Sequence, residues 1–90
     1  MSAPLEIGVE ISLYPLNADY IPTIQDFIDR LNAAGRFKVI TNSMSTQVFG
    51  TYDDVFGALQ REIRATFEQN EKSQHKAVFV MKVLGPLAPA

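Results

Sequence analysis

The stretch from Thr41 to Asp54 reads TNSMSTQVFGTYDD. Asn42 and Ser43 tolerate turn conformations and can hydrogen-bond to their own backbone, which favours a tight turn at this point. The residues that follow alternate as in a strand, and Thr51 with the acidic residues after it is typical of a helix start. We therefore expect a hairpin turn, a hydroxyl-rich strand and a helix N-terminus to converge here and to hold a small ligand.

A strand is predicted upstream of this stretch, after a loose lead at residues 1–5. Residues 6–14 alternate between apolar and more polar side chains, which is the pattern of a half-buried strand. The polar side carries Glu10, Ser12 and Tyr14, which we expect in one column on one face of the sheet.

Three more strands complete the pattern. Residues 37–41 form a short strand that the turn joins to residues 45–50, and the gap is short enough for a hairpin. Residues 76–84 read KAVFVMKVL, almost continuously apolar, and predict the last strand. The remaining residues, 85–90, read as a tail.

The first helix is expected between the first two strands. Asp19 is the predicted cap, Pro22 lies in the first turn, where its missing N–H costs little, and Gly35 ends the helix. Apolar residues recur at spacings of three and four, so one stripe of the helix packs and Arg30 is expected on the exposed side.

The second helix is expected to begin at Thr51, a capping residue followed by two acidic residues that suit the positive end of a helix dipole. Its charged residues, Glu62 among them, are expected in solvent. Gln69–Gln74 is polar throughout and is predicted to be a loop.

The predicted order of elements is β-α-β-β-α-β, in a single domain covering residues 1–90. Two right-handed crossover units around a central hairpin give the ferredoxin-like fold, an α+β two-layer sandwich with a four-stranded antiparallel sheet and two helices on one face. The other sheet face is then bare in a monomer, and the last strand has apolar residues on both sides. Because exposed apolar patches and free edge strands mark interfaces, we expect self-association.

The composition excludes several classes of protein. The chain has no Cys and one His, so disulfides, thiolate metal sites and multi-histidine metal centres are not expected. Eight Lys+Arg against ten Asp+Glu give a net charge of −2, without the basic patch typical of nucleic-acid binding. There is no apolar run long enough for a membrane span and no signal-peptide pattern, so we expect a cytoplasmic protein without membrane partners. No cofactor is predicted.

Catalysis has little support in the sequence. His75 lies in a charged loop, far in sequence from Ser43 and Ser45, so no nucleophile and base are paired by the pattern. Asp53 and Asp54 are adjacent and therefore point in different directions on a helix. No glycine-rich phosphate loop is present. We expect a protein that is not an enzyme.

Three pieces of the sequence together resemble the thiamine-binding, YkoF-like domain family: ISLYPL (11–16), TNSMSTQVFGTYDDVF (41–56) and VFVMKVLG (78–85). The resemblance covers nearly the whole chain. It implies a ferredoxin-like fold, a cytoplasmic location and homodimers or homotetramers formed through the sheets. It also implies binding of thiamine or its hydroxymethylpyrimidine moiety without catalysis. Some relatives carry two such domains in one chain, whereas this chain has one.

An aminopyrimidine ligand needs hydroxyl, amide or backbone partners together with a flat apolar surface, and a thiazolium cation needs an aromatic face or a carboxylate. The carboxylates that could serve the cation are Glu10 and Asp53, while Phe49 is expected in the core. The predicted ligand-binding residues are Glu10, Ser12, Tyr14, Asn42, Ser43, Met44, Ser45, Thr46, Gln47, Tyr52 and Asp53.

Some of these residues also have a plainer structural interpretation. Glu10 can face solvent or a partner subunit, Asp53 can be a helix-start acid, and Ser43 can simply form the turn. Two functions therefore stay open: a carrier, buffer or sensor of a small molecule, and an oligomeric structural or interaction module with no thiamine ligand. A third, an enzyme acting on the same vitamin, is disfavoured by the lack of an acid–base pair.

Overall fold

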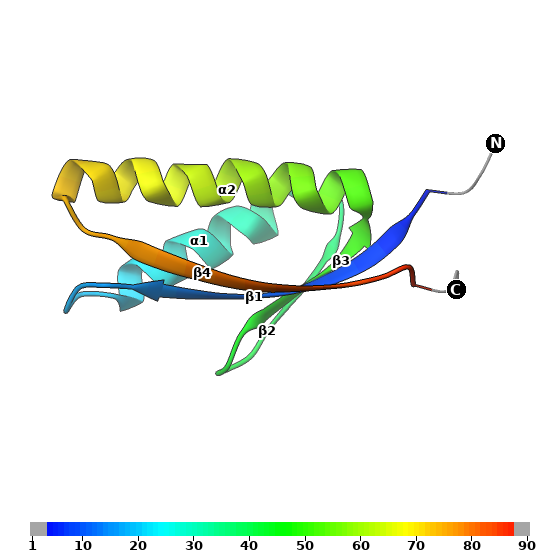
Figure 1. Cartoon of the computed structure of the whole chain (residues 1–90), viewed down its shortest axis with the longest axis horizontal. Helices are drawn as coiled ribbons and strands as arrows, with labels where there is room; N and C mark the ends of the chain where they lie inside the picture. Colours follow the sequence, from blue (N-terminus) through cyan, green and yellow to red (C-terminus); the bar gives the residue numbers. More distant parts are fainter. Residues whose placement is uncertain (1–3, 88–90) are drawn as a thin grey trace.

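The computed structural model describes residues 4–87, and the ends of the expected lead and tail, residues 1–3 and 88–90, lie outside the described residues. The elements follow one another in the predicted order (Figure 1). They are β1 (Glu6–Pro15), α1 (Ile21–Ala33), β2 (Lys38–Thr41), β3 (Thr46–Thr51), α2 (Tyr52–Ser73) and β4 (Ala77–Leu84).

The four strands form one antiparallel sheet in the order β2-β3-β1-β4. Both helices lie on the same face of this sheet, with α2 running along its length (Figure 1). The β-α-β-β-α-β order and the two-layer arrangement confirm the predicted ferredoxin-like α+β fold.

The core lies between the sheet and the helices. Alternate residues of β1 point into it, as the period-two pattern predicted, and they meet the central strand β3 and the inner faces of both helices. The buried apolar residues are Ile7, Val9, Ile11, Phe27, Leu31, Val48, Val55, Ala58 and Leu59.

The ends of the helices are partly as predicted. The Thr51 side chain accepts a hydrogen bond from the Asp54 backbone N–H at 3.3 Å, which confirms it as the cap of α2. Gly35, with φ of 79°, follows the last turn of α1 as expected. The prediction that Asp19 caps α1 is wrong, because the helix begins at Ile21 and Tyr20 occupies the cap position without a side-chain hydrogen bond.

The prediction of a loop at Gln69–Gln74 is also wrong, because α2 continues to Ser73. Glu, Gln and Lys favour helices, so a polar composition alone does not end one. Asn70 is buried within this last part of the helix, and its carbonyl accepts the His75 backbone N–H at 3.0 Å. The chain leaves the helix at Gln74, which has a left-handed φ of 61°.

Arg30 and Glu62 were predicted on the solvent side of their helices, and this prediction is wrong, because the two side chains join the helices to each other. Arg30 Nε donates to Glu62 Oε1 at 2.8 Å, and its terminal nitrogen donates to Thr66 Oγ1 at 2.8 Å. Asp26, one turn before Arg30, pairs with the same guanidinium. The side chains of Arg30 and Glu62 are only 23% and 16% exposed. Charged residues therefore cross-link α1 and α2 beside the apolar core.

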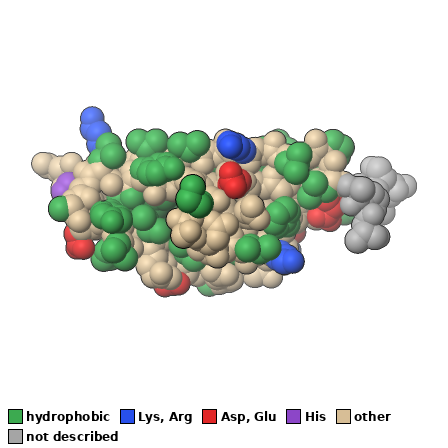
Figure 2. Space-filling model, turned by 90° about the horizontal axis from the view of Figure 1, so that it is seen from below, with side chains coloured by type: hydrophobic (Ala, Val, Ile, Leu, Met, Phe, Trp, Pro, Cys, Tyr) green, Lys and Arg blue, Asp and Glu red, His purple; other side chains and the backbone are tan. Residues whose placement is uncertain are grey.

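The face of the sheet opposite the helices is uncovered within residues 4–87. Figure 2 shows hydrophobic side chains gathered over this face, with few charged groups among them. The register places Tyr14 beside Val78 and Ser12 beside Val80 there, and all but Ser12 are exposed. Phe49, expected in the core, lies half-buried on this face, where its ring packs so close to Gly8 that a Cβ there would be 2.8 Å from Phe49 Cε1.

In the described part of the chain, neither helix combines the length and the apolar character that crossing a bilayer requires.

Candidate functional site

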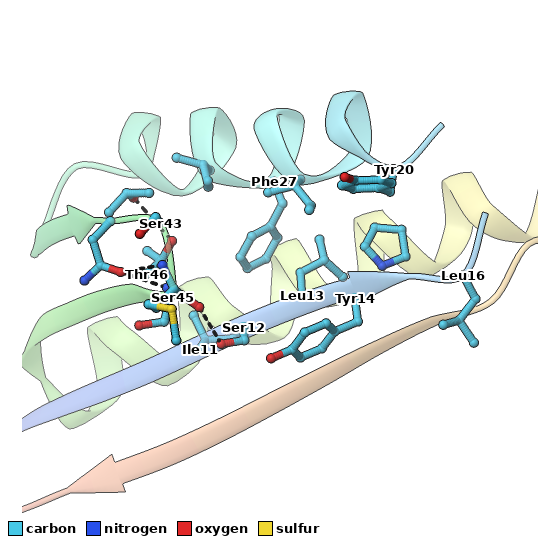
Figure 3. A pocket seen from close by; sticks show the side chains of 16 residues that line it. Ile11, Ser12, Leu13, Tyr14, Leu16, Tyr20, Phe27, Ser43, Ser45 and Thr46 are labelled. Carbon is cyan, nitrogen blue, oxygen red and sulfur yellow. Dashed lines mark hydrogen bonds between the residues drawn. The ribbon is translucent and has the colours of Figure 1, made fainter. Parts of the chain in front are cut away.

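A pocket of about 480 Å³ opens between the end of β1, the start of α1 and the β2–β3 hairpin (Figure 3). It arises because β1 is longer than its partner on one side. The pairing of β1 with β3 ends at Ile11↔Thr46, whereas the pairing with β4 continues to Pro15↔Ala77. Residues 12–15 thus have a strand on one side only, and the hairpin and α1 enclose the space on the other. The pocket is lined by Ile11, Ser12, Leu13, Tyr14, Pro15, Leu16, Tyr20, Ile24, Phe27, Ile28, Thr41, Asn42, Ser43, Met44, Ser45 and Thr46.

The inner surface of the pocket is apolar and aromatic. Figure 3 shows Phe27 extending from α1 toward β1, with Leu13 opposite it and Tyr20 at the start of the helix. Phe27 is buried, and its ring packs against Phe79 of β4 with centroids 5.1 Å apart. This contact holds the Phe27 ring against β4, so the ring is supported from behind by the core.

The hairpin forms the polar wall of the pocket. Asn42 Oδ1 accepts hydrogen bonds from the backbone N–H groups of Met44 and Ser45, at 2.8 and 2.9 Å. The Asn42 N–H in turn donates to the Ser45 carbonyl at 3.0 Å. The hydroxyls of Thr41 and Thr46 lie 3.2 Å apart and share a hydrogen bond. The predicted turn at Asn42 and Ser43 is therefore present, and the Asn side chain holds its shape.

Two side chains of β1 tie this wall to the sheet. Ser45 Oγ donates to Glu10 Oε2 at 3.1 Å, and Ser12 Oγ makes a longer contact, 3.4 Å, to the Met44 carbonyl. Glu10 also lies 4.0 Å from the ammonium group of Lys82 on β4. These contacts fix the hairpin to β1, and Glu10 of β1 in turn lies near Lys82 of β4.

Among residues 4–87, none of those that line the pocket is charged. Hydroxyl and amide groups on the hairpin face an apolar and aromatic surface from β1 and α1. Such a pocket suits a flat, polar ring without net negative charge, because an anion would be buried there without a cationic partner. His75 is outside the pocket, where its Nδ1 lies 3.3 Å from Asn17 Nδ2.

The family comparison agrees with this architecture. The model of the YKOF-related family matches residues 6–83, nearly the whole chain. The chain belongs to the YKOF-related family. No curated protein matches it.

Several solved structures share the fold of this YKOF-related protein. A hypothetical protein of Methanocaldococcus jannaschii is 20% identical, with a TM-score of 0.76 over 94% of this chain and 84% of that one. A proposed thiamine biosynthesis/salvage protein of Thermotoga maritima is 16% identical, with a TM-score of 0.73 over 87% and 81%. A domain of unknown function, DUF77, from Bacillus cereus is 15% identical, with a TM-score of 0.73 over 92% and 79%.

The YKOF-related fold brings most of the predicted ligand-binding residues together. Those that line the pocket are Ser12, Tyr14, Asn42, Ser43, Met44, Ser45 and Thr46. Glu10 and Gln47 are paired across β1 and β3 and are not among the lining residues, although Glu10 accepts a hydrogen bond from Ser45. Their part in ligand binding stays a prediction.

Tyr52 and Asp53 do not belong to this pocket, which corrects the expected single cluster. They begin α2 at the far end of β3, and a strand of this length separates them from the hairpin by about 20 Å. Tyr52 packs on Phe56, with ring centroids 4.7 Å apart. Asp53 lines a separate hollow of about 190 Å³ that also includes Arg36 and Arg61.

The sequence-based prediction missed the part of the pocket that comes from α1 and the loop before it. The main contributors are Leu16, Tyr20, Ile24, Phe27 and Ile28. One signal was available: the apolar stripe of α1 begins in its first turn, a few residues after β1 ends, which predicts that this part of the helix packs near the end of β1.

Proposed function

We infer that this protein binds thiamine or its hydroxymethylpyrimidine moiety, without transforming it, as a cytoplasmic carrier, buffer or sensor. The observation that carries this proposal is the uncharged pocket whose hydroxyl and amide wall faces an aromatic floor. Membership of the YKOF-related family and the fold shared with a proposed thiamine biosynthesis/salvage protein support the same ligand class.

An aminopyrimidine ring matches the two sides of the pocket. Its flat faces would lie against Phe27 and Leu13, and its ring nitrogens and amino group would reach the hairpin. Ser45 and Thr46 are half-buried and buried, unlike the exposed residues 41–44 of that wall, so hydrogen bonds made there are better shielded from water.

The thiazolium of thiamine would lie nearer the mouth of the pocket. In the part of the chain that the structure describes, no carboxylate lines the pocket: Glu10 contacts it only through Ser45, and Asp53 lines a separate hollow. The aromatic rings of Tyr14 and Tyr20 are at the mouth and more than 45% exposed, so they offer cation–π contacts instead. We therefore expect the pyrimidine to supply most of the affinity.

Isothermal titration with hydroxymethylpyrimidine, thiamine and thiamine diphosphate tests the proposal. We expect the first two to bind and the diphosphate to bind about tenfold more weakly or worse, because no Lys or Arg among the described residues lines the pocket to pair with phosphate. Absence of heat from all three at millimolar concentration would refute the proposed function. Tighter binding of the diphosphate would place the ligand outside this pocket.

A second function, an oligomeric interaction module, is favoured by one observation: the uncovered sheet face carries exposed Val78, Val80 and Leu84, each at 46% or more. Self-association through this face would cover these side chains. Ser12 and Tyr14 lie on this face and also line the pocket, so a second copy that covered the face would border the ligand site.

A further inference from the structure

The Ser45 hydroxyl has a fixed direction of hydrogen bonding. A carboxylate can only accept, so the 3.1 Å contact between Ser45 Oγ and Glu10 Oε2 uses the single proton of the hydroxyl. What Ser45 can then offer to the pocket that it lines is a lone pair. The acceptor character of this position is therefore imposed by Glu10, a residue of β1 that does not itself line the pocket.

The neighbouring groups follow the same logic. The Ser12 hydroxyl is directed toward the Met44 carbonyl, at 3.4 Å, which also leaves its lone pairs free. Asn42 Oδ1 is occupied by two backbone N–H groups, so its amide NH₂ is the part that remains for a ligand. The wall therefore presents acceptors at Ser45 and Ser12 and a donor at Asn42.

We propose that Glu10 is a specificity-determining positioning residue, which holds Ser45 as an acceptor so that the pocket selects rings bearing an amino group over their oxo counterparts. This inference rests on the proposed function. An aminopyrimidine edge offers an N–H donor beside a ring-nitrogen acceptor, the complement of this wall. In the oxo counterpart a carbonyl would face the Ser45 lone pair, and the ring nitrogen beside it carries a proton toward the Asn42 amide.

The test compares the dissociation constants of hydroxymethylpyrimidine and of its oxo counterpart, in which a carbonyl replaces the ring amino group. The unaltered protein is expected to prefer the amino ring by about tenfold or more, the cost of one mismatched, partly buried hydrogen-bonding group. In Glu10→Gln the new amide can donate to Ser45 Oγ and release its proton toward the ligand. We expect the preference to fall to about threefold or less.

Two further variants separate selectivity from a general structural effect. Glu6→Gln makes the same change on β1 at the opposite end of the β1–β3 pairing, beside Thr51, and should leave the preference unchanged. Ser45→Ala removes the hydroxyl itself, so adding Glu10→Gln to it should not change the preference further. Circular dichroism confirms that each variant is folded, and Ser45→Ala alone tests the acceptor if Glu10→Gln does not fold.

The outcomes distinguish the two proposals. Equal affinity of the unaltered protein for both rings overturns the role of Glu10 while leaving the proposed function in place. Loss of affinity for both rings by the same factor in Glu10→Gln also overturns it, because a merely structural contact would behave in that way. Failure of both rings to bind the unaltered protein refutes the proposed function and this inference with it.

Discussion

Replacing Ile24 with tryptophan is expected to weaken the binding of hydroxymethylpyrimidine by about a hundredfold or more, since the indole would occupy space that the ring needs. Ile24 lines the pocket and is half-buried, so we expect the larger tryptophan side chain to extend into the pocket. The pocket holds about 480 Å³, and Phe27 lies in its lining on the same helix, one turn after Ile24. Isothermal titration measures the effect.

A matched control exists one turn earlier on the same helix. Ile21 is 65% exposed and does not line the pocket, so Ile21→Trp adds the same side chain without obstructing the site. We expect it to bind with nearly unchanged affinity. Native affinity in Ile24→Trp, with the fold intact by circular dichroism, would show that the ligand binds elsewhere.

Replacing Val80 with aspartate is expected to weaken self-association by about a hundredfold or more. Val80 lies on β4 opposite Ser12, on the uncovered sheet face, and is 49% exposed. If a second copy covers this face, the variant buries a carboxylate among apolar side chains, and burial of an unpaired charge is costly. Sedimentation velocity should show the native chain, of 10.0 kDa, as a dimer or larger and the variant as a monomer.

The control for this variant lies on the helical layer. Gln69 is exposed on α2, so Gln69→Asp changes the charge by the same amount away from the sheet face. It should sediment like the native protein. A monomeric native protein at micromolar concentration, or an oligomer that Val80→Asp leaves intact, would contradict self-association through this face.

Much of the fold could be predicted because its signals are local. The alternation of residues 6–14 determines which side of β1 is buried, and Thr51 satisfies a free N–H at the start of α2. The hairpin at Asn42 likewise depends on a side chain that bonds to its own backbone two and three residues away. These interactions require nothing from distant parts of the chain.

The features that were missed depend on contacts between distant segments. The pocket exists because the β1–β3 pairing stops at Ile11, and the sequence pattern does not give that register. Arg30 contacts Glu62 and Thr66 across two helices, which a charged residue on a helix does not reveal by its spacing. Tyr52 and Asp53 are close in sequence to the hairpin, yet the extended β3 carries them to the other end of the sheet.

The most direct test of the central claim is a nuclear magnetic resonance titration of the isotope-labelled protein with hydroxymethylpyrimidine. We expect backbone shift changes concentrated at residues 12–16, 20–28 and 41–46, the three segments that enclose the pocket. Little change is expected at the start of α2, residues 52–61, which lies beyond β3. Changes centred on 52–61 instead, or none at millimolar ligand, would contradict binding in this pocket.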